Sequence, residues 1–123
     1  MKVLLDTDVI IQCLRGVKRE SERIKQMLKN SDEIFFTPIS SAEIYAGIKR
    51  GEEKIVAEFF DILRPIEIGC VTGEKAGEYL RTYRKSHSLE IADALIAAAA
   101  FITRAKLYTL NKKHYPMRDI SFS

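Results

Sequence analysis

Short apolar runs alternate with segments of helical spacing in the first third of the chain. Val3–Leu5 is a continuous apolar run that stops at Asp6, which predicts a buried strand leading into the N-terminus of a helix. Apolar positions then recur at helical spacing over residues 21–29, and a second apolar run follows at 34–36. The resulting order of strand, helix and strand is typical of a parallel sheet.

The middle of the chain predicts two helices followed by a strand. Pro38 suits the first turn of a helix over residues 37–49, with Gly51 as its C-terminal glycine. Apolar positions over 55–63 form one face of a second helix, which we expect Arg64-Pro65 to terminate. Residues 66–68 then supply a third short strand.

The rest of the chain predicts an amphipathic helix, then a buried helix and then two strands. Helical spacing covers residues 72–85, and the segment 91–102 (IADALIAAAAFI) is apolar nearly all round, which indicates a helix buried on most of its surface. Residues 107–110 and 120–122 are expected to be strands, the second at an edge of the sheet. Alternating strands and helices favour an α/β fold, a largely parallel sheet covered by helices on both faces.

Composition fits one ordinary globular domain. The 123 residues are 46% hydrophobic and 30% charged, and no repeat or linker divides them. The formal net charge of +3 permits an anionic partner without demanding one. Basic residues gather after the first strand, where composition alone favours a solvated helix face over phosphate binding; they are Arg15, Lys18, Arg19, Arg23, Lys25 and Lys29.

The cysteine positions and the apolar runs argue against a zinc-binding, disulfide-rich, secreted or membrane-spanning protein. Cys13 and Cys70 lie far apart and form no zinc or disulfide motif, which fits a reducing cytoplasm. The apolar run before Asp6 is too short for a signal peptide, and no run is long enough to span a membrane. We therefore expect a cytoplasmic protein with no membrane association.

Four polar residues are expected near the carboxyl ends of the strands, where open α/β sheets bind ligands. They are Asp6, Glu43, Asp93 and Asn111. Each also has a structural explanation: Asp6 and Asp8 as helix caps, Ser40 with Glu43 as a capping box, Asp93 as a partner of a helix dipole, and Asn111 as a turn residue.

Acids at the ends of very apolar elements favour a metal site. Like charges about 4 Å apart repel by roughly 4 kcal/mol at an effective dielectric near 20, so gathered carboxylates must take up protons or bind a cation. Oxygen ligands suit Mg²⁺ or Mn²⁺, whereas zinc prefers His or Cys. Such ions activate water and stabilise a phosphoryl centre during in-line displacement.

Four segments resemble the signature regions of PIN domains, and most closely those of VapC-type toxins. They are LLDTDVII, PISSAEIYAGI, ADALIAAAA and LYTLNKKHY, in the family's order and spacing over nearly the whole chain. The resemblance implies a single PIN domain over residues 1–123, a three-layer α/β/α sandwich around a mainly parallel sheet of four or five strands.

The resemblance also implies a metal-dependent endoribonuclease, the toxin of a toxin–antitoxin pair. Asp6, Glu43 and Asp93 would hold Mg²⁺ (or Mn²⁺), with Glu43 as a ligand or as the group that positions the attacking water. Asn111 stands where the family has Asp or Asn and lowers the charge of the site, which weakens a second metal; Asp119 is a poor substitute. Thr7 and Thr109 match hydroxyls that support the site.

Partners follow from the same resemblance. It implies single-stranded or loop RNA as the substrate, a cognate antitoxin that blocks the active-site groove, and a homodimer. The basic residues that flank the expected crevice in sequence are candidate RNA contacts: Arg15, Lys18, Lys112 and Lys113.

Three other functions stay open at this point. Asp6-Thr7-Asp8 resembles the D-x-D motif of haloacid-dehalogenase-type phosphatases, although Ile10 departs from that family's pattern. His87 and His114 would serve a ribonuclease that needs no metal. The weaker charge at Asn111 favours a PIN module that binds RNA or protein with little catalysis.

Overall fold

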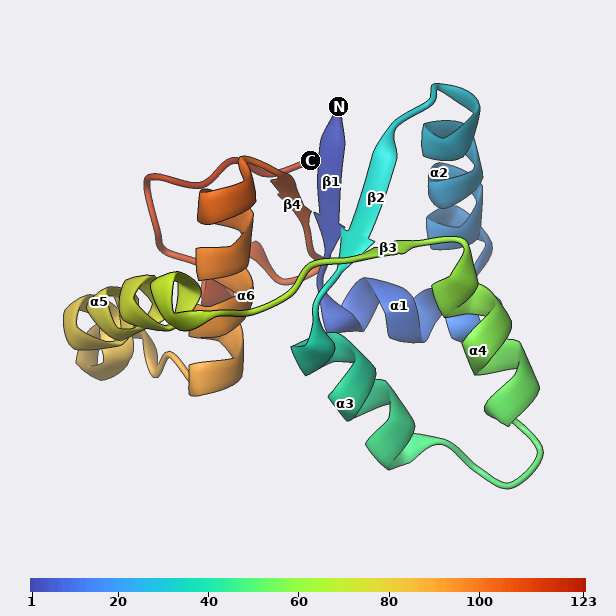
Figure 1. Ribbon diagram of the computed structural model, residues 1–123, viewed down its shortest axis with the longest axis horizontal. Helices are drawn as coiled ribbons and strands as arrows, with labels where there is room; N and C mark the ends of the chain where they lie inside the picture. Colours follow the sequence, from blue (N-terminus) through green and yellow to red (C-terminus); the bar gives the residue numbers. More distant parts are fainter.

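The computed structural model describes residues 1–123 as a sheet surrounded by helices (Figure 1). In chain order the elements are β1 (Lys2–Leu5), α1 (Thr7–Leu14), α2 (Lys18–Lys29), β2 (Glu33–Phe36), α3 (Pro38–Gly47), α4 (Glu53–Asp61), β3 (Arg64–Pro65), α5 (Cys70–His87), α6 (Ile91–Thr103), β4 (Lys106–Tyr108) and the 3-10 helix η1 (Lys112–His114). None of these helices is both long and apolar enough to cross a membrane.

The sheet has four parallel strands in the order β3-β2-β1-β4, which confirms the predicted parallel α/β fold. Successive side chains of β1 point to opposite faces of the sheet, so the hydrophobic core has one part on each face. Leu4 packs with α5 and α6, while Val3 and Leu5 pack with α1, α2 and α4. Figure 1 shows the resulting three layers, with α5 and α6 on one side of the sheet and α1, α2 and α4 on the other.

Helix α6 is enclosed on nearly all sides, because it packs with α5 as well as with strands β1 and β4. Alanines 97 to 100 are at most 1% exposed, so a larger side chain at these positions would overpack the core. The prediction of a mostly buried helix is therefore confirmed. Only its ends are open to solvent, where Ile91 and Phe101 are exposed.

The third strand forms two residues earlier than the sequence indicates. Arg64 and Pro65 were expected to end a helix, but they pair with Phe35 and Phe36 of β2. Proline is tolerated there because β3 is at the edge of the sheet, where its missing N–H has no partner to lose. The predicted strand at 66–68 is therefore wrong, although the backbone N–H of Ile66 still donates to the carbonyl of Phe36 at 2.8 Å.

The predicted edge strand at 120–122 is also wrong. Phe122 makes a single parallel bridge to Leu107, supported by backbone hydrogen bonds from Leu107 to Ser121 and from Ser123 to Leu107. Because β4 is only three residues long, it offers the returning chain little more than one residue for pairing.

Helix α3 and strand β4 both end before the predicted residue. Helix α3 ends at Gly47 and not near Lys49, and Gly51 lies in the following turn with a φ of 93°. Gly51 therefore supports the turn before α4, a left-handed conformation that glycine tolerates. Strand β4 ends at Tyr108, and the next two residues, 109 and 110, donate hydrogen bonds to Asp6 and Asp8 at the start of α1.

Candidate active site

Asp6 is at the centre of the polar cluster at the carboxyl ends of β1 and β4. It follows β1 directly and caps α1, with Oδ1 accepting from the backbone N–H of Thr7 at 2.8 Å. Its Oδ2 accepts from the hydroxyls of Thr109 at 2.8 Å and Tyr115 at 2.9 Å. Asp6 therefore both caps α1 and belongs to the polar cluster. It is buried, with 8% of its surface exposed.

Asp8 belongs to the same cluster, although the sequence suggested it only as a helix cap or as part of a phosphatase D-x-D motif. Its Oδ2 accepts from the backbone N–H of Leu110 at 3.1 Å, while its Oδ1 is buried without any hydrogen-bond partner. Burial, and then the charge of Asp6, raise the pKa of Asp8 to about 6. An orphaned buried carboxylate oxygen is rare in folded proteins and marks a place that a proton or a cation would fill.

Glu43 is connected to the cluster through Thr7. The Thr7 hydroxyl donates to Glu43 Oε1 at 2.8 Å, and because it has a single hydrogen, Ser40 must be the donor in the 2.8 Å contact between the two hydroxyls. The predicted capping box of Ser40 and Glu43 is wrong, since Thr37 caps α3 and accepts from the backbone N–H of Ser40. Glu43 itself is exposed and free to face a ligand.

Asp93 approaches the cluster from the first turn of α6. Burial raises the pKa of Asp93, the charge of Asp6 raises it further, and His114 opposes the effect. Asp93 also lines a cavity of about 370 Å³ together with His87 and His114. The two histidines thus line the same cavity as an acid of the cluster, where a metal-independent ribonuclease would use them as acid and base.

Asn111 does not reach the acids. Its Nδ2 lies 3.2 Å from His114 Nε2, and its backbone N–H donates to the Thr109 hydroxyl at 3.1 Å. Asn111 is therefore placed to orient Thr109, which in turn donates to Asp6. The structure shows no hydrogen bond from Asn111 to Asp6, Glu43 or Asp93, the acids with which it was expected to share one crevice.

The four predicted RNA contacts are spread over three places. Lys112 and Lys113 line a cavity of about 600 Å³, and Arg15 lines another of about 240 Å³ together with Glu43. Lys18 lines none of the described cavities and forms an exposed ion pair with Glu22 at 3.8 Å.

Tyr115 is a site residue that sequence reasoning missed. It is 3% exposed, and its hydroxyl donates to Asp6. Burial, followed by the charges of Asp6 and Asp93, raises the pKa of Tyr115 well above its usual range, so the phenol stays a donor. The only signal in the sequence was an aromatic residue close to Asn111, and that gave no reason to expect burial among carboxylates.

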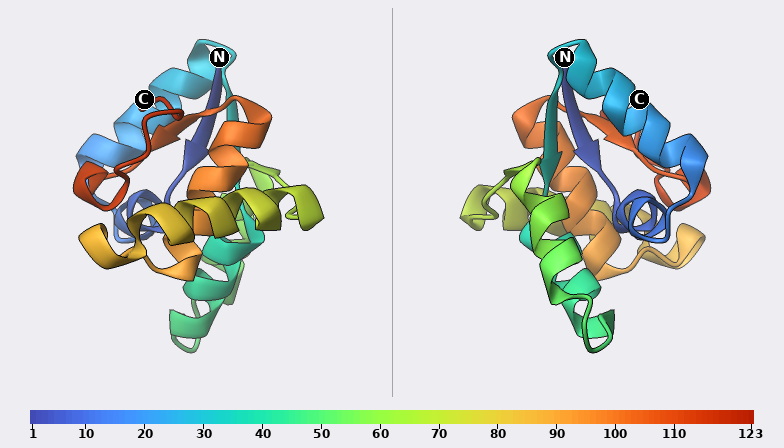
Figure 2. Two further views of the ribbon diagram at one scale, coloured as in Figure 1. Left: turned by 90° about the vertical axis from the view of Figure 1, so that its left-hand side faces the viewer. Right: turned by 90° about the vertical axis from the view of Figure 1, so that its right-hand side faces the viewer.

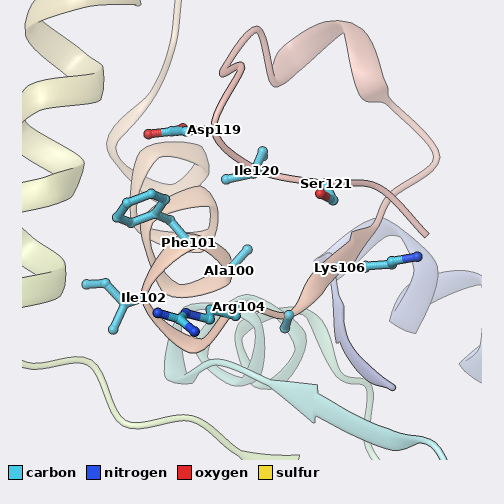
Figure 3. Close-up of a pocket in the computed structure, with 9 residues that line it drawn as sticks. Ala100, Phe101, Ile102, Arg104, Lys106, Asp119, Ile120 and Ser121 are labelled. Carbon is cyan, nitrogen blue, oxygen red and sulfur yellow. The ribbon is translucent and has the colours of Figure 1, made fainter.

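Asp119 is excluded from the site by its position. Figure 3 shows it at a separate cavity of about 660 Å³ near the C-terminal end of α6, with Phe101 and Ile120 among the lining residues. Asp119 instead accepts from Tyr79 at 2.7 Å and pairs with Lys75 at 2.8 Å. It is therefore no substitute for an acid at position 111.

The donor chemistry of the acidic site fits a hard divalent cation, although its ligands are not assembled. No three His, Cys, Asp or Glu side chains are grouped closely enough to hold a metal ion as they stand, so the predicted set of Asp6, Glu43 and Asp93 is not a preformed site. The orphaned Asp8 Oδ1 and the raised pKa values of Asp8 and Asp93 nonetheless show uncompensated negative charge. We call Asp6, Asp8, Glu43 and Asp93 the acidic site.

Comparison with known sequences identifies relatives over nearly the whole chain. Residues 3–120 match the family model described as PIN domain. The chain is 33% identical to Ribonuclease VapC10 of Mycobacterium tuberculosis over 94% of this chain and 86% of the relative. It is 30% identical to Ribonuclease VapC19 of the same organism over 93% of this chain and 92% of that relative.

Solved structures share the fold at lower identity. A chain in the crystal structure of VapBC2 from Rickettsia felis bound to a DNA fragment from their promoter has a TM-score of 0.83 and 24% identity, covering 100% of this chain and 98% of that one. A chain of VapBC-1 from nontypeable Haemophilus influenzae has a TM-score of 0.80 and 23% identity, covering 100% and 97%.

Proposed function

This chain belongs to the PIN-domain family, and on that premise we propose that it is a divalent-metal-dependent endoribonuclease, the toxin of a toxin–antitoxin pair. The observation that carries the proposal is the acidic site itself, in which Asp6 is surrounded by hydroxyl donors and lies close enough to Asp8 and Asp93 to raise the pKa of both. The proposal treats residues 1–123 as one PIN domain.

Asp6 and Asp93 would hold Mg²⁺ or Mn²⁺, with Asp8 as a third oxygen donor. When bound, the ion supplies positive charge beside the scissile phosphate and lowers the pKa of a coordinated water. Glu43 completes the site either as a ligand or by orienting the attacking water. Its connection to Thr7 supports both roles, because the hydrogen bond directs its carboxylate toward the start of α1.

Hydroxyl groups of this chain keep the acids in place. Thr109 and Tyr115 both donate to Asp6 Oδ2, which fixes the plane of that carboxylate. Ser40 and Thr7 form a short relay from the start of α3 to the start of α1. Such supporting contacts commonly set the affinity of a carboxylate site for its metal.

Partners are proposed from the relatives. The two mycobacterial proteins carry the name ribonuclease, and similar folds occur in a toxin-antitoxin complex from Klebsiella pneumoniae. From these names we propose RNA as the substrate and an antitoxin as a protein partner. Single-stranded or loop RNA, a second copy of this chain as partner, and the cytoplasm as the place of action are proposed from the sequence and its family resemblance. A splayed phosphate in a loop reaches a compact crevice more easily than one in a duplex.

Cleavage of a pool of structured RNAs tests the proposal. Purified protein is incubated with Mg²⁺, with Mn²⁺ or with EDTA, and Asp6→Asn is run beside the wild type. We expect cleavage that needs metal and disappears in the variant.

Each rival function gives a different result. Cleavage that survives EDTA would assign the chemistry to His87 and His114, which line a cavity with Asp93. A covalent aspartyl phosphate would indicate the phosphatase. RNA binding without any cleavage would indicate the binding module.

A further inference from the structure

A cavity of about 600 Å³ adjoins the acidic site on the side of α2. Both views in Figure 2 place the turn that contains η1 beside the N-terminal half of α2, and the cavity lies between these two segments. It is lined by Arg19, Glu20, Arg23, Tyr108, Thr109, Leu110, Asn111, Lys112, Lys113 and Ser123. Thr109 connects it to the acidic site, because the same residue lines the cavity and donates to Asp6 at 2.8 Å.

The cavity has an excess of unpaired positive charge. Four cationic side chains and a single acid line it, and none of the four cations forms an ion pair. Other cations of the chain do pair, including Lys18 with Glu22 and Lys75 with Asp119. The cations of this cavity are therefore available to an external anion.

One of these cations is already held in place. The guanidinium carbon of Arg23 lies 4.4 Å from the centre of the Tyr108 ring, and its Nη2 donates to Ser123 Oγ at 3.3 Å. Two contacts on one guanidinium limit its rotation, so the binding of an anion costs less side-chain entropy. The remaining N–H groups of a guanidinium suit a phosphate, which accepts paired hydrogen bonds.

The acidic site explains why a cationic neighbour is needed. Carboxylates repel the phosphates of an RNA strand at the place where one phosphate must be cut. Cations beside the acids offset this repulsion and attract the adjoining phosphates of the strand. The basic cavity and Asp6 share Thr109 as a common neighbour, so phosphates adjoining one held at the acidic site would lie near these cations.

We propose that this cavity is a phosphate-binding subsite of the RNA substrate, in which Arg19, Arg23, Lys112 and Lys113 hold the backbone next to the scissile phosphate. The subsite rests on the proposed ribonuclease function. It assigns RNA binding to the N-terminal half of α2 and to η1, and it leaves the exposed Lys18 outside the contact.

Binding of a short fluorescein-labelled single-stranded RNA, measured by anisotropy in EDTA, tests the subsite without any cleavage. The affinity is determined between about 50 and 200 mM salt for the wild type, Arg19→Gln/Arg23→Gln and Lys113→Gln. Removal of one cation that binds a phosphate should reduce the steepness of log K against log salt by about 0.7, and the double variant should bind roughly tenfold more weakly at low salt. Lys25→Gln is the matched control, because Lys25 is an exposed cation of α2 outside the cavity.

Arg23→Lys separates charge from packing. It keeps the positive charge and should keep the salt slope, even if loss of the contact with Tyr108 weakens the fold. Lys113→Gln removes a charge from an exposed position. The subsite is overturned if Lys113→Gln and the double variant show the wild-type slope, or if Lys25→Gln lowers it equally. Because the probe is not cut, absence of ribonuclease activity would defeat the proposed function alone, while unchanged slopes beside normal cleavage would defeat the subsite alone.

Discussion

The acidic site and a second polar cluster on the α5 side of the molecule use the same residue types with opposite electrostatic outcomes. In the second cluster, Tyr79 donates to Asp119 and Lys75 pairs with it. Burial alone would raise the pKa of Asp119, but hydrogen bonds from Lys75 and Tyr79 lower it below its ordinary value. We call these three residues the Lys75 cluster.

The acidic site has the tyrosine but no such cation. Tyr115 donates to Asp6 as Tyr79 donates to Asp119, yet the neighbouring acids, Asp8 and Asp93, have raised pKa values. A cluster that neutralises itself stabilises the fold, whereas one that leaves charge uncompensated costs stability and is typical of functional sites. The difference separates a structural acid from an acid kept for chemistry, although both stand beside a buried phenol.

The largest expected contrast is between two Asp to Asn changes. Asp6→Asn should lower the rate of RNA cleavage roughly 100-fold or more, because an amide replaces the central carboxylate. Asp119→Asn should leave cleavage unchanged, since it removes an acid whose partners are Lys75 and Tyr79, away from the acidic site. Initial rates on one RNA substrate compare the two variants, and circular dichroism checks that each is folded. Equal losses of activity would mean that the second cluster also serves catalysis.

The two tyrosines give the next contrast. Tyr115→Phe removes a donor to Asp6 in a buried position and should reduce metal affinity or cleavage roughly tenfold. Tyr79→Phe removes the matching donor to Asp119 and should change neither. Titration of activity with Mn²⁺ distinguishes weaker binding from slower chemistry. A Tyr115→Phe enzyme with both the wild-type Mn²⁺ dependence and the wild-type maximal rate would show that the phenol only fills space.

Sequence periodicity was sufficient for the elements whose signal is local. The apolar run before Asp6 and the alanine-rich stretch around Asp93 predicted β1 and α6, because both are buried by their own composition. The strand at 64–65 and the single bridge at Phe122 depend on which neighbour offers backbone groups, so no local pattern reveals them.

The candidate site was predictable in part for the same reason. Asp6 and Asp93 follow or precede apolar elements, which marks them in the sequence. Tyr115 and Asp8 are defined by contacts that close when residues 109–115 return to α1. Asn111 was expected among the acids, yet its side chain contacts His114 because η1 begins directly after it.

Removing the cation from the Lys75 cluster should make that cluster resemble the acidic site. Lys75 Nζ pairs with Asp119 at 2.8 Å and Glu78 at 3.6 Å. It also lies 4.1 Å from the centre of the Phe101 ring and 4.9 Å from that of Tyr79. Lys75→Met removes both ion pairs and both cation–π contacts while keeping most of the bulk. We expect a loss of about 1 kcal/mol in the free energy of unfolding, because the pairs are partly exposed to solvent. Urea denaturation measures the loss, with Lys54→Met, which breaks an exposed pair on α4, as the control. A loss no larger than that of the control would make the cluster energetically irrelevant.

Removing a negative charge from the acidic site should have the smallest effect on the free energy of unfolding, and it should stabilise the protein. The pKa of Asp8 is raised to about 6 in the folded protein, so the wild type binds this proton more tightly when folded and its stability declines as pH rises from about 4 to 6. Asp8→Asn removes that decline and should stabilise the metal-free protein at neutral pH by at most about 1 kcal/mol, since the side chain is only half-buried. Thermal unfolding in EDTA across this pH range measures it, with Glu67→Gln, an exposed acid without an ion pair, as the control. If Asp8→Asn instead destabilises the protein at every pH, the hydrogen bond from Leu110 outweighs the repulsion, and Asp8 is a structural acid like Asp119.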